Sequence, residues 1–166
     1  MSLDWIRNGV FFVVLLLVQA LVLNYVHLFD CATPLLYVYF VLPTRRNQPQ
    51  WLTLLLCFCM GLCVDSFSNT PGVAAASMTL AGVLQPYLLR LFIQQDSPED
   101  LRPSIKVLGP MKYVFYTIII VTVYCLMFFT LEAFNFFNWL QWLASVGGST
   151  VVTILLILVI DNFRKR

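Results

Sequence analysis

Charged residues are scarce in this sequence, and their scarcity excludes an ordinary soluble domain. Only 11% of its 166 residues are Asp, Glu, Lys or Arg, whereas 60% are hydrophobic. A water-soluble domain usually has about a quarter of its residues charged, because charge covers the surface that faces water. The composition therefore predicts a single polytopic membrane domain over residues 1–166, with no room for a separate soluble catalytic domain.

Residues that commonly carry chemistry are also few. His27 is the only histidine, and the sequence contains no P-loop, no G-x-G-x-x-G, no G-x-S-x-G and no H-E-x-x-H motif. An intramembrane protease would need a nucleophile with a base, or paired aspartates, and no such pair is visible in the apolar runs. Three of the five cysteines form a C-x-C-x3-C string at 57–63, in an apolar run without a nearby histidine. We therefore expect no enzyme activity, no metal site, no cofactor and no nucleic-acid partner.

Long uncharged runs separate the few charges. They cover residues 8–29, 31–44, 47–64, 66–89, 113–131 and 133–160. A spanning helix needs about 20 mostly apolar residues. The runs therefore predict an all-α integral membrane bundle of about six transmembrane helices, near residues 9–26, 29–42, 49–67, 72–92, 111–131 and 139–160. The second is short, since about 14 helical residues reach only about 21 Å. We expect it to pack against its neighbours, and a partly re-entrant course stays open.

The positions of the basic residues support six spans. If both termini are cytoplasmic, all ten Lys and Arg residues fall in inner segments, as the preference of basic residues for cytoplasmic loops requires. The outer loops then carry Asp30, Asp65 and Glu132 instead. We expect both termini and the loop with Arg45 and Arg46 to be cytoplasmic. The inner basic residues also suit anionic membrane lipid as a binding partner.

Asp65 is the first candidate site residue. It follows Gly61 by four positions, so both lie on one face of the predicted third helix. An acid at the membrane edge is suited to binding an ion, relaying a proton or pairing with a partner. It is equally suited to ending its own helix or capping the turn into the next one. Both interpretations stay open.

Small residues gather in two of the predicted helices. Gly82 lies in the fourth and Gly148 in the sixth, each among Ala, Ser, Thr or a second Gly. Small residues let helices approach closely in lipid, so these faces are expected either to pack within the bundle or to dock a partner's helix. Pro86 is expected to kink the fourth helix, and Gln85 beside it to find a polar partner inside the bundle.

Residues 61–72 read GLCVDSFSNTPG, with Gly61, Asp65, Pro71 and Gly72 as the fixed points. This stretch resembles the G-L-x-x-D-x-x-x-x-x-P-x-G signature of the MreD family of rod shape-determining membrane proteins. Pro71 and Gly72 are adjacent here, where the signature separates them by one residue. The short length and the six-span layout are also similar to that family.

The resemblance implies a fold similar to the substrate-binding subunits of energy-coupling-factor transporters. It implies a non-enzymatic scaffold of the cell-elongation complex in the bacterial inner membrane. Its expected partners are a single-span MreC-like protein and, directly or indirectly, MreB and the peptidoglycan synthases. The likeness to transporter subunits leaves an alternative, which is a membrane subunit that binds a small molecule.

Overall fold

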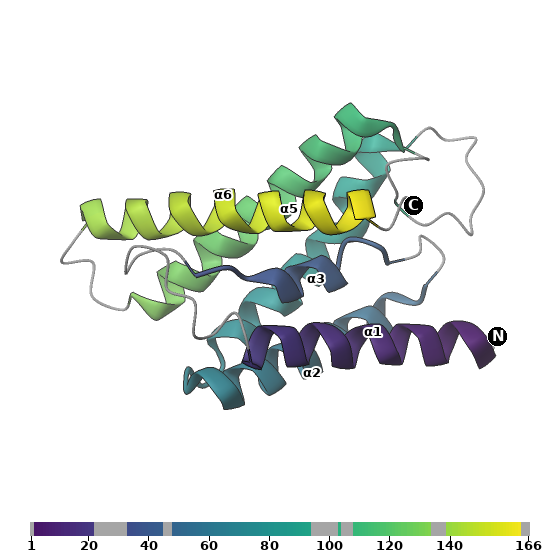
Figure 1. Ribbon diagram of the computed structural model, residues 1–166, viewed down its shortest axis with the longest axis horizontal. Helices are drawn as coiled ribbons and strands as arrows, with labels where there is room; N and C mark the ends of the chain where they lie inside the picture. Colours follow the sequence, from purple (N-terminus) through teal and green to yellow (C-terminus); the bar gives the residue numbers. More distant parts are fainter. Residues whose placement is uncertain are drawn as a thin grey trace.

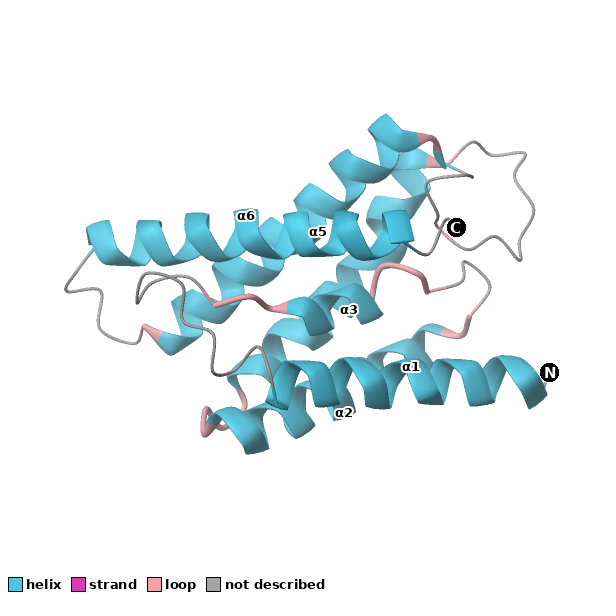
Figure 2. Ribbon diagram, in the orientation of Figure 1, coloured by secondary structure: helices cyan, strands magenta, loops and turns pink. Residues whose placement is uncertain are grey.

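The protein is all-helical over the part that the structure covers. A computed structural model describes residues 2–21, 33–44, 48–93, 103, 108–133 and 139–163. No strand occurs among these residues, which confirms the predicted all-α class. Figure 2 shows the helices and the connections between them. In chain order the elements are α1 (Ser2–Leu21), the 3-10 helix η2 (Leu36–Phe40), α2 (Gln50–Ser68), α3 (Val73–Phe92), α5 (Pro110–Glu132) and α6 (Trp139–Phe163).

Four predicted helices coincide with observed ones. The ranges 49–67, 72–92, 111–131 and 139–160 correspond to α2, α3, α5 and α6, with ends that differ by three residues at most. Two loop signals explain the agreement, since α2 begins after Pro49 and α5 begins at Pro110, where proline suits the first helical turn. The first helix begins earlier than predicted, at Ser2, and residues 22–26 of the predicted range lie outside the described residues.

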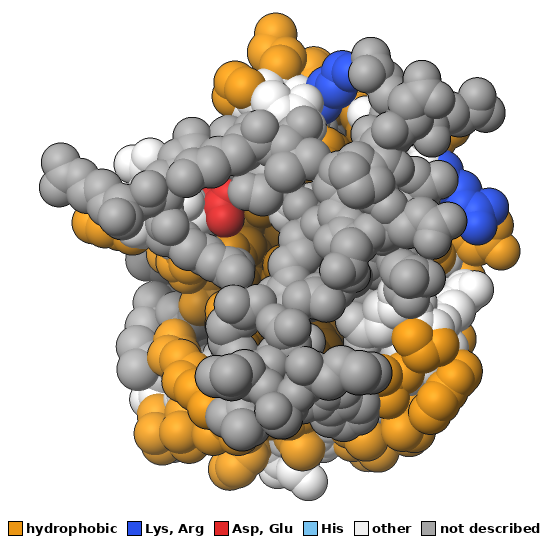
Figure 3. All heavy atoms as spheres, turned by 90° about the vertical axis from the view of Figure 1, so that its right-hand side faces the viewer, with side chains coloured by type: hydrophobic (Ala, Val, Ile, Leu, Met, Phe, Trp, Pro, Cys, Tyr) orange, Lys and Arg blue, Asp and Glu red, His pale blue; other side chains and the backbone are white. Residues whose placement is uncertain are grey.

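Successive segments run in opposite directions. The right-hand side of Figure 1 holds the starts of α1 and α5 and the ends of α3 and α6. We call this side the basic end, because the exposed Arg90 and Lys112 lie there, in the last turn of α3 and the first turn of α5. Lys and Arg side chains are visible when this end is viewed directly, with hydrophobic side chains around the flanks (Figure 3). The opposite side, where α2 and α5 end near Asp65 and Glu132, is called the acidic end.

The outside of the bundle is apolar and parts of its inside are polar. Leu140, Val151 and Leu155 on α6 are 86%, 57% and 58% exposed, whereas Ser149 and Thr153 on the same helix are fully buried. This arrangement suits lipid as the surrounding solvent, because lipid tails accept apolar surface and cannot satisfy hydroxyl groups. By length and composition α2, α5 and α6 are each able to cross a membrane. These helices indicate a membrane protein.

The predicted second helix, near residues 29–42, is wrong in its described part. Residues 33–44 take another form there, and we call them the central strap. Residues 33–35 have no regular structure, η2 follows, and residues 41–43 form a turn, so no α-helix occupies the described part of the range 29–42. Pro34 lies inside that range, where it would break a helix. Extended and 3-10 backbone also advance about 3.3 and 2.0 Å per residue, against about 1.5 Å in an α-helix. A short segment can therefore cover a longer distance in this form.

The strap lies between α1 and α6, enclosed by protein. Leu35 through Tyr39, with Val41 and Leu42, are at most 5% exposed. Near the acidic end Gln19 of α1 contacts Leu36, and farther along Phe12 of α1 packs edge-to-face on Phe40. The strap therefore runs antiparallel to α1, from the acidic end to the basic end (Figure 1). The expectation that this segment packs against its neighbours is confirmed.

Candidate functional site

Asp65 joins the end of α2 to the start of α3. Its side chain is 4% exposed. Oδ1 accepts hydrogen bonds from the Ala74 amide at 2.9 Å and the Thr70 hydroxyl at 3.1 Å, and Oδ2 accepts from the Ala75 amide at 3.0 Å. The first amides of a helix have no partner within the helix, and Gly72, the residue before α3, has no side chain to cap them. Asp65 therefore caps α3 from the preceding helix, where a carboxylate also complements the helix dipole.

The turn between α2 and α3 contains two left-handed residues. Asn69 has φ 57° and Gly72 has φ 85°, with Pro71 between them. The Asn69 and Thr70 amides donate to the main-chain carbonyl of Asp65. Asn and Gly tolerate this backbone region, which other residues rarely adopt. The turn thereby places Asp65 opposite the two amides that it caps.

Gly61 allows the two helices to touch along their backbones. A Cβ atom added at Gly61 would lie 2.4 Å from Ala75 Cα and 2.7 Å from the Ala74 carbonyl oxygen. Real Cβ atoms do not approach so closely, so only glycine fits here. We call the group formed by Gly61, Asp65, Thr70, Ala74 and Ala75 the Asp65 junction. The capping interpretation of Asp65 is confirmed, and Pro71 and Gly72 form the turn beside it.

The other two predicted site residues lie elsewhere. Gly82 is on the same α2–α3 interface, nearer the basic end, and a Cβ there would lie 3.1 Å from Cys57 Sγ. Its small size therefore serves packing within the bundle. Gly148 is half-buried on α6, which packs on α5 and the strap rather than on the Asp65 junction. The structure thus brings together Gly61, Asp65, Pro71 and Gly72, and separates Gly148 from them.

A second polar site holds the backbone of the strap. The Gln19 side chain donates to the Pro34 carbonyl and accepts from the Leu36 amide, both at 3.0 Å. Ser149 accepts from the Thr33 amide at 3.0 Å, and Thr153 accepts from the Leu35 amide at 3.1 Å. These side chains supply the partners that a helix would have found in its own backbone. Non-helical backbone is thus satisfied inside an apolar bundle.

Tyrosine side chains of the strap extend this site to α5 and to a further residue of α6. The Tyr37 hydroxyl hydrogen-bonds the Tyr124 hydroxyl of α5. The Tyr39 hydroxyl donates to Asp161 Oδ1 of α6 at 2.9 Å. All four side chains are buried, and Asp161, at 8% exposed, is the least enclosed of them. The strap therefore contacts α1, α5 and α6 through side-chain hydrogen bonds.

The predicted site does not include these strap partners. Gln19, Thr153 and Asp161 each interrupt or end an apolar run, and that interruption is the one local signal they give. Their partners are 15 to 122 positions away in the sequence, so no short motif contains both members of a pair. A polar residue in an apolar span indicates that a buried partner exists, but the sequence does not identify that partner.

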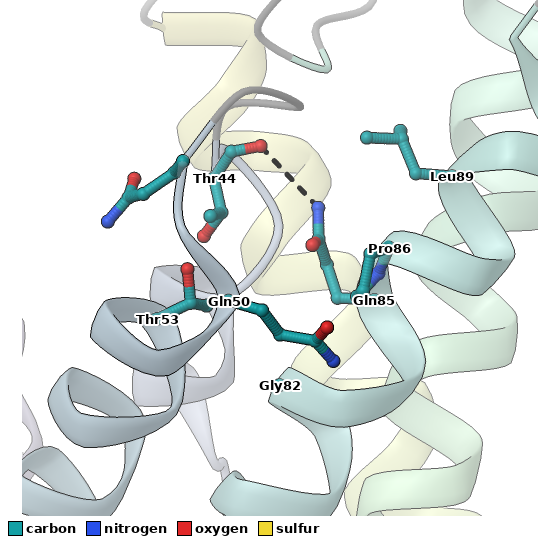
Figure 4. A pocket seen from close by; sticks show the side chains of 8 residues that line it. Thr44, Gln50, Thr53, Gly82, Gln85, Pro86 and Leu89 are labelled. Atoms are coloured by element: carbon teal, nitrogen blue, oxygen red, sulfur yellow. Dashed lines mark hydrogen bonds between the residues drawn. The ribbon is translucent and has the colours of Figure 1, made fainter.

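A small cleft opens at the basic end between α2, α3 and the strap. Figure 4 shows Gln85 pointing toward Thr44, whose carbonyl accepts from Gln85 Nε2 at 3.4 Å. The expected polar partner of Gln85 inside the bundle is therefore Thr44. The cleft has a volume of about 30 Å³, and its lining consists of Thr44, Gln48, Gln50, Thr53, Gly82, Gln85, Pro86 and Leu89. This space suits a molecule the size of water.

Within the described residues, no group of three or more His, Cys, Asp or Glu side chains is placed to hold a metal ion. No protein family, curated protein or solved structure matches this chain.

Proposed function

We propose that this chain is a non-enzymatic membrane scaffold of the MreD kind, which binds a single-span partner similar to MreC. The observation that carries this proposal is the Asp65 junction. Gly61 and Asp65, which give the sequence its resemblance to MreD, serve to fix one helix against the next, and Gly72 forms the turn between them. Residues that hold two helices rigidly together suit a scaffold, because a surface that is already ordered before binding loses less conformational entropy when a partner docks.

The same proposal includes six crossings of the bacterial inner membrane, with both termini in the cytoplasm. Its support is the alternating direction of α1, the strap, α2, α3, α5 and α6 (Figure 1). The strap is able to serve as the second crossing because Gln19, Ser149 and Thr153 satisfy its backbone at membrane depth. In this orientation the basic end faces the cytoplasm, in accord with the preference of Lys and Arg for that side. We further propose a fold similar to the substrate-binding subunits of energy-coupling-factor transporters.

The proposed role is to connect the partner helix with the cell-elongation machinery. A bundle fixed internally by hydrogen bonds leaves its exposed apolar faces for lipid and for another helix. Through an MreC-like protein the scaffold would be linked, directly or indirectly, to MreB and the peptidoglycan synthases. The alternative, a small-molecule-binding subunit, has less support from the cleft at Gln85. Ligand pockets usually enclose about 300–1,000 Å³, whereas this cleft has about 30 Å³.

Depletion of the protein combined with co-purification tests this proposal. In a rod-shaped host that depends on this gene, loss of the chain should produce round cells. A tagged chain extracted in mild detergent should recover the single-span partner. An unrelated multi-span protein with the same tag is the control for detergent carry-over. Normal rods after full depletion, or no partner in the eluate, would reject the scaffold function.

A further inference from the structure

One buried hydroxyl of the bundle has no partner within the described chain. Five Ser and Thr side chains of the described helices are buried, and four of them are hydrogen-bonded. Ser77 and Thr117 donate to carbonyls of their own helices. Ser149 and Thr153 accept from amides of the strap. Thr53 of α2 is the exception, since it is 5% exposed and its hydroxyl makes no hydrogen bond among the described residues. A buried hydroxyl is unfavourable without a partner, so we expect a partner from outside the chain.

The Thr53 hydroxyl faces the cleft at the basic end, which Thr53 lines together with Thr44 and Gly82. Figure 4 shows the hydroxyls of Thr44 and Thr53 pointing toward one another, and no hydrogen bond joins them. The Gly82 carbonyl lacks the donor that an amide at position 86 would supply, because Pro86 has no amide hydrogen. The cleft therefore offers both donors and acceptors in a space of about 30 Å³. A single hydroxyl group matches this lining in chemistry and in size, because it donates and accepts at once.

The surroundings of the cleft place it at the level of the lipid headgroups. Trp51, next to the cleft residue Gln50, is 67% exposed, and exposed tryptophan prefers the membrane–water interface. Arg90 follows Pro86 by four positions on α3, so it lies one turn beyond the cleft on the same face of the helix. Its side chain is exposed and makes no ion pair among the described residues. A cation in this position suits a lipid phosphate.

We propose that the cleft binds a headgroup hydroxyl of an anionic phospholipid, of the phosphatidylglycerol type. The hydroxyl bonds Thr53 and Thr44, and the phosphate of the same headgroup lies against Arg90. A glycerol headgroup carries a hydroxyl only a few bonds from its phosphate, so one lipid supplies both groups. This inference does not depend on the proposed scaffold function, since it concerns the lipid around the chain.

Two lipids of equal charge test this site, because they differ in the hydroxyls of their headgroups. Phosphatidylglycerol has such hydroxyls, whereas phosphatidylmethanol has none. Native mass spectrometry of the full-length protein in mild detergent measures the binding of each lipid. The wild type should bind phosphatidylglycerol about 2- to 10-fold more tightly, which is the weight of one neutral hydrogen bond. Equal affinity for the two lipids would overturn the proposal and leave the cleft to water.

Substitutions at the site locate the two contacts. Thr53→Val should lower the affinity for phosphatidylglycerol to that for phosphatidylmethanol, and a preference that survives this change would reject the site. Arg90→Gln should weaken both lipids by about 5-fold, the weight of one basic residue near an anionic membrane, and unchanged affinities would reject the phosphate contact.

Thr117→Val is the matched control, because it removes a buried hydroxyl that bonds the Tyr113 carbonyl of its own helix. It should bind both lipids as the wild type does. Loss of the preference in Thr117→Val as well would mean a general loss of packing and would overturn the proposal. If Thr53→Val does not fold, Thr44→Val removes the opposite hydroxyl and decides in the same way.

Discussion

At the scale of single residues, Asp65 shows how a buried acid near the end of a helix can serve structure. Its carboxylate accepts three hydrogen bonds, two from amides of α3 and one from Thr70. Asp65→Asn keeps the size of the side chain but replaces one acceptor oxygen by an NH₂ group, which cannot accept from the Ala75 amide. We expect the free energy of unfolding to fall by about 1–2 kcal/mol, as on loss of a helix cap. Thermal unfolding in one defined lipid or detergent measures this loss.

The neighbouring Ser66→Ala is the control for Asp65→Asn. Ser66 is exposed, and we expect its replacement to be neutral. Asp65→Asn with wild-type stability and reduced recovery of a partner would assign Asp65 to direct binding instead. A loss of stability that the control does not share supports its role as a cap.

Gly61 and Gly147 form a second pair for comparison at this scale. Gly61→Ala places a Cβ against the backbone of Ala75, so α2 and α3 must separate, and we expect a loss of about 1–3 kcal/mol. Gly147→Ala adds the same methyl group on α6, where nothing lies within 4 Å. We expect it to be neutral or stabilising, because alanine favours a helix by about 1 kcal/mol over glycine. Equal effects on the melting temperature of the two variants would contradict the close backbone approach at Gly61.

At the scale of elements, the strap depends on side chains of α1 and α6 for the acceptors of its Thr33, Leu35 and Leu36 amides. Ser149→Ala leaves the part-buried Thr33 amide without its acceptor, and Thr153→Val leaves the buried Leu35 amide without its acceptor. We expect each to destabilise the protein by about 1–3 kcal/mol. Thr150→Val is the control between them, because that hydroxyl bonds the Val146 carbonyl of its own helix. Unfolding of the three variants in the same lipid should separate the first two from the third, and equal melting temperatures would contradict this role of α6.

The elements also differ in how far the sequence predicts them. The ends of α2, α3, α5 and α6 follow from local signals, since charges, Pro and Gly stand where apolar runs stop. The strap does not follow from local signals, because its Thr33 and Leu35 amides bond Ser149 and Thr153, which are 116 and 118 positions away. An apolar run of that length is compatible with a short helix until these partners are known. The cap by Asp65 is intermediate in how far the sequence predicts it, since its hydrogen bonds join residues only five to ten positions apart.

At the scale of the whole molecule, the bundle has an apolar exterior and polar contacts at its centre and ends. The hydrogen bonds of the strap reach α1, α3, α5 and α6, so one short segment ties four helices together. Helices in lipid gain little from the hydrophobic effect when they associate, and packing and hydrogen bonds take its place. A sequence with few polar residues can still specify one arrangement when those residues converge on one element.

The direction of the strap, together with the proposed cytoplasmic position of the basic end, predicts on which side of the membrane each end of the bundle lies. α1 and the strap run in opposite directions, so Ser2 at the start of α1 and Gln48 after the strap should lie on the same side. Pro71, between α2 and α3, and Glu132, the last residue of α5, lie at the acidic end and should be on the other side. Single cysteines at these four positions in an otherwise cysteine-free chain should react accordingly with an impermeant thiol reagent. In intact cells Pro71→Cys and Glu132→Cys should be labelled, whereas Ser2→Cys and Gln48→Cys should react only after the membrane is opened.

The comparison of Ser2→Cys with Gln48→Cys is the decisive part of this experiment. A strap that enters the membrane and returns to the same side would place these two cysteines on opposite sides, while one that crosses places them together. Pro71→Cys and Gln48→Cys flank α2, which is long and apolar enough to cross by itself, so their opposite labelling is the internal control. Labelling of Gln48→Cys without Ser2→Cys in intact cells would reduce the number of crossings to five. Equal protection of both would support a second crossing without an α-helix, in which side chains of α1 and α6 bond the backbone of the strap.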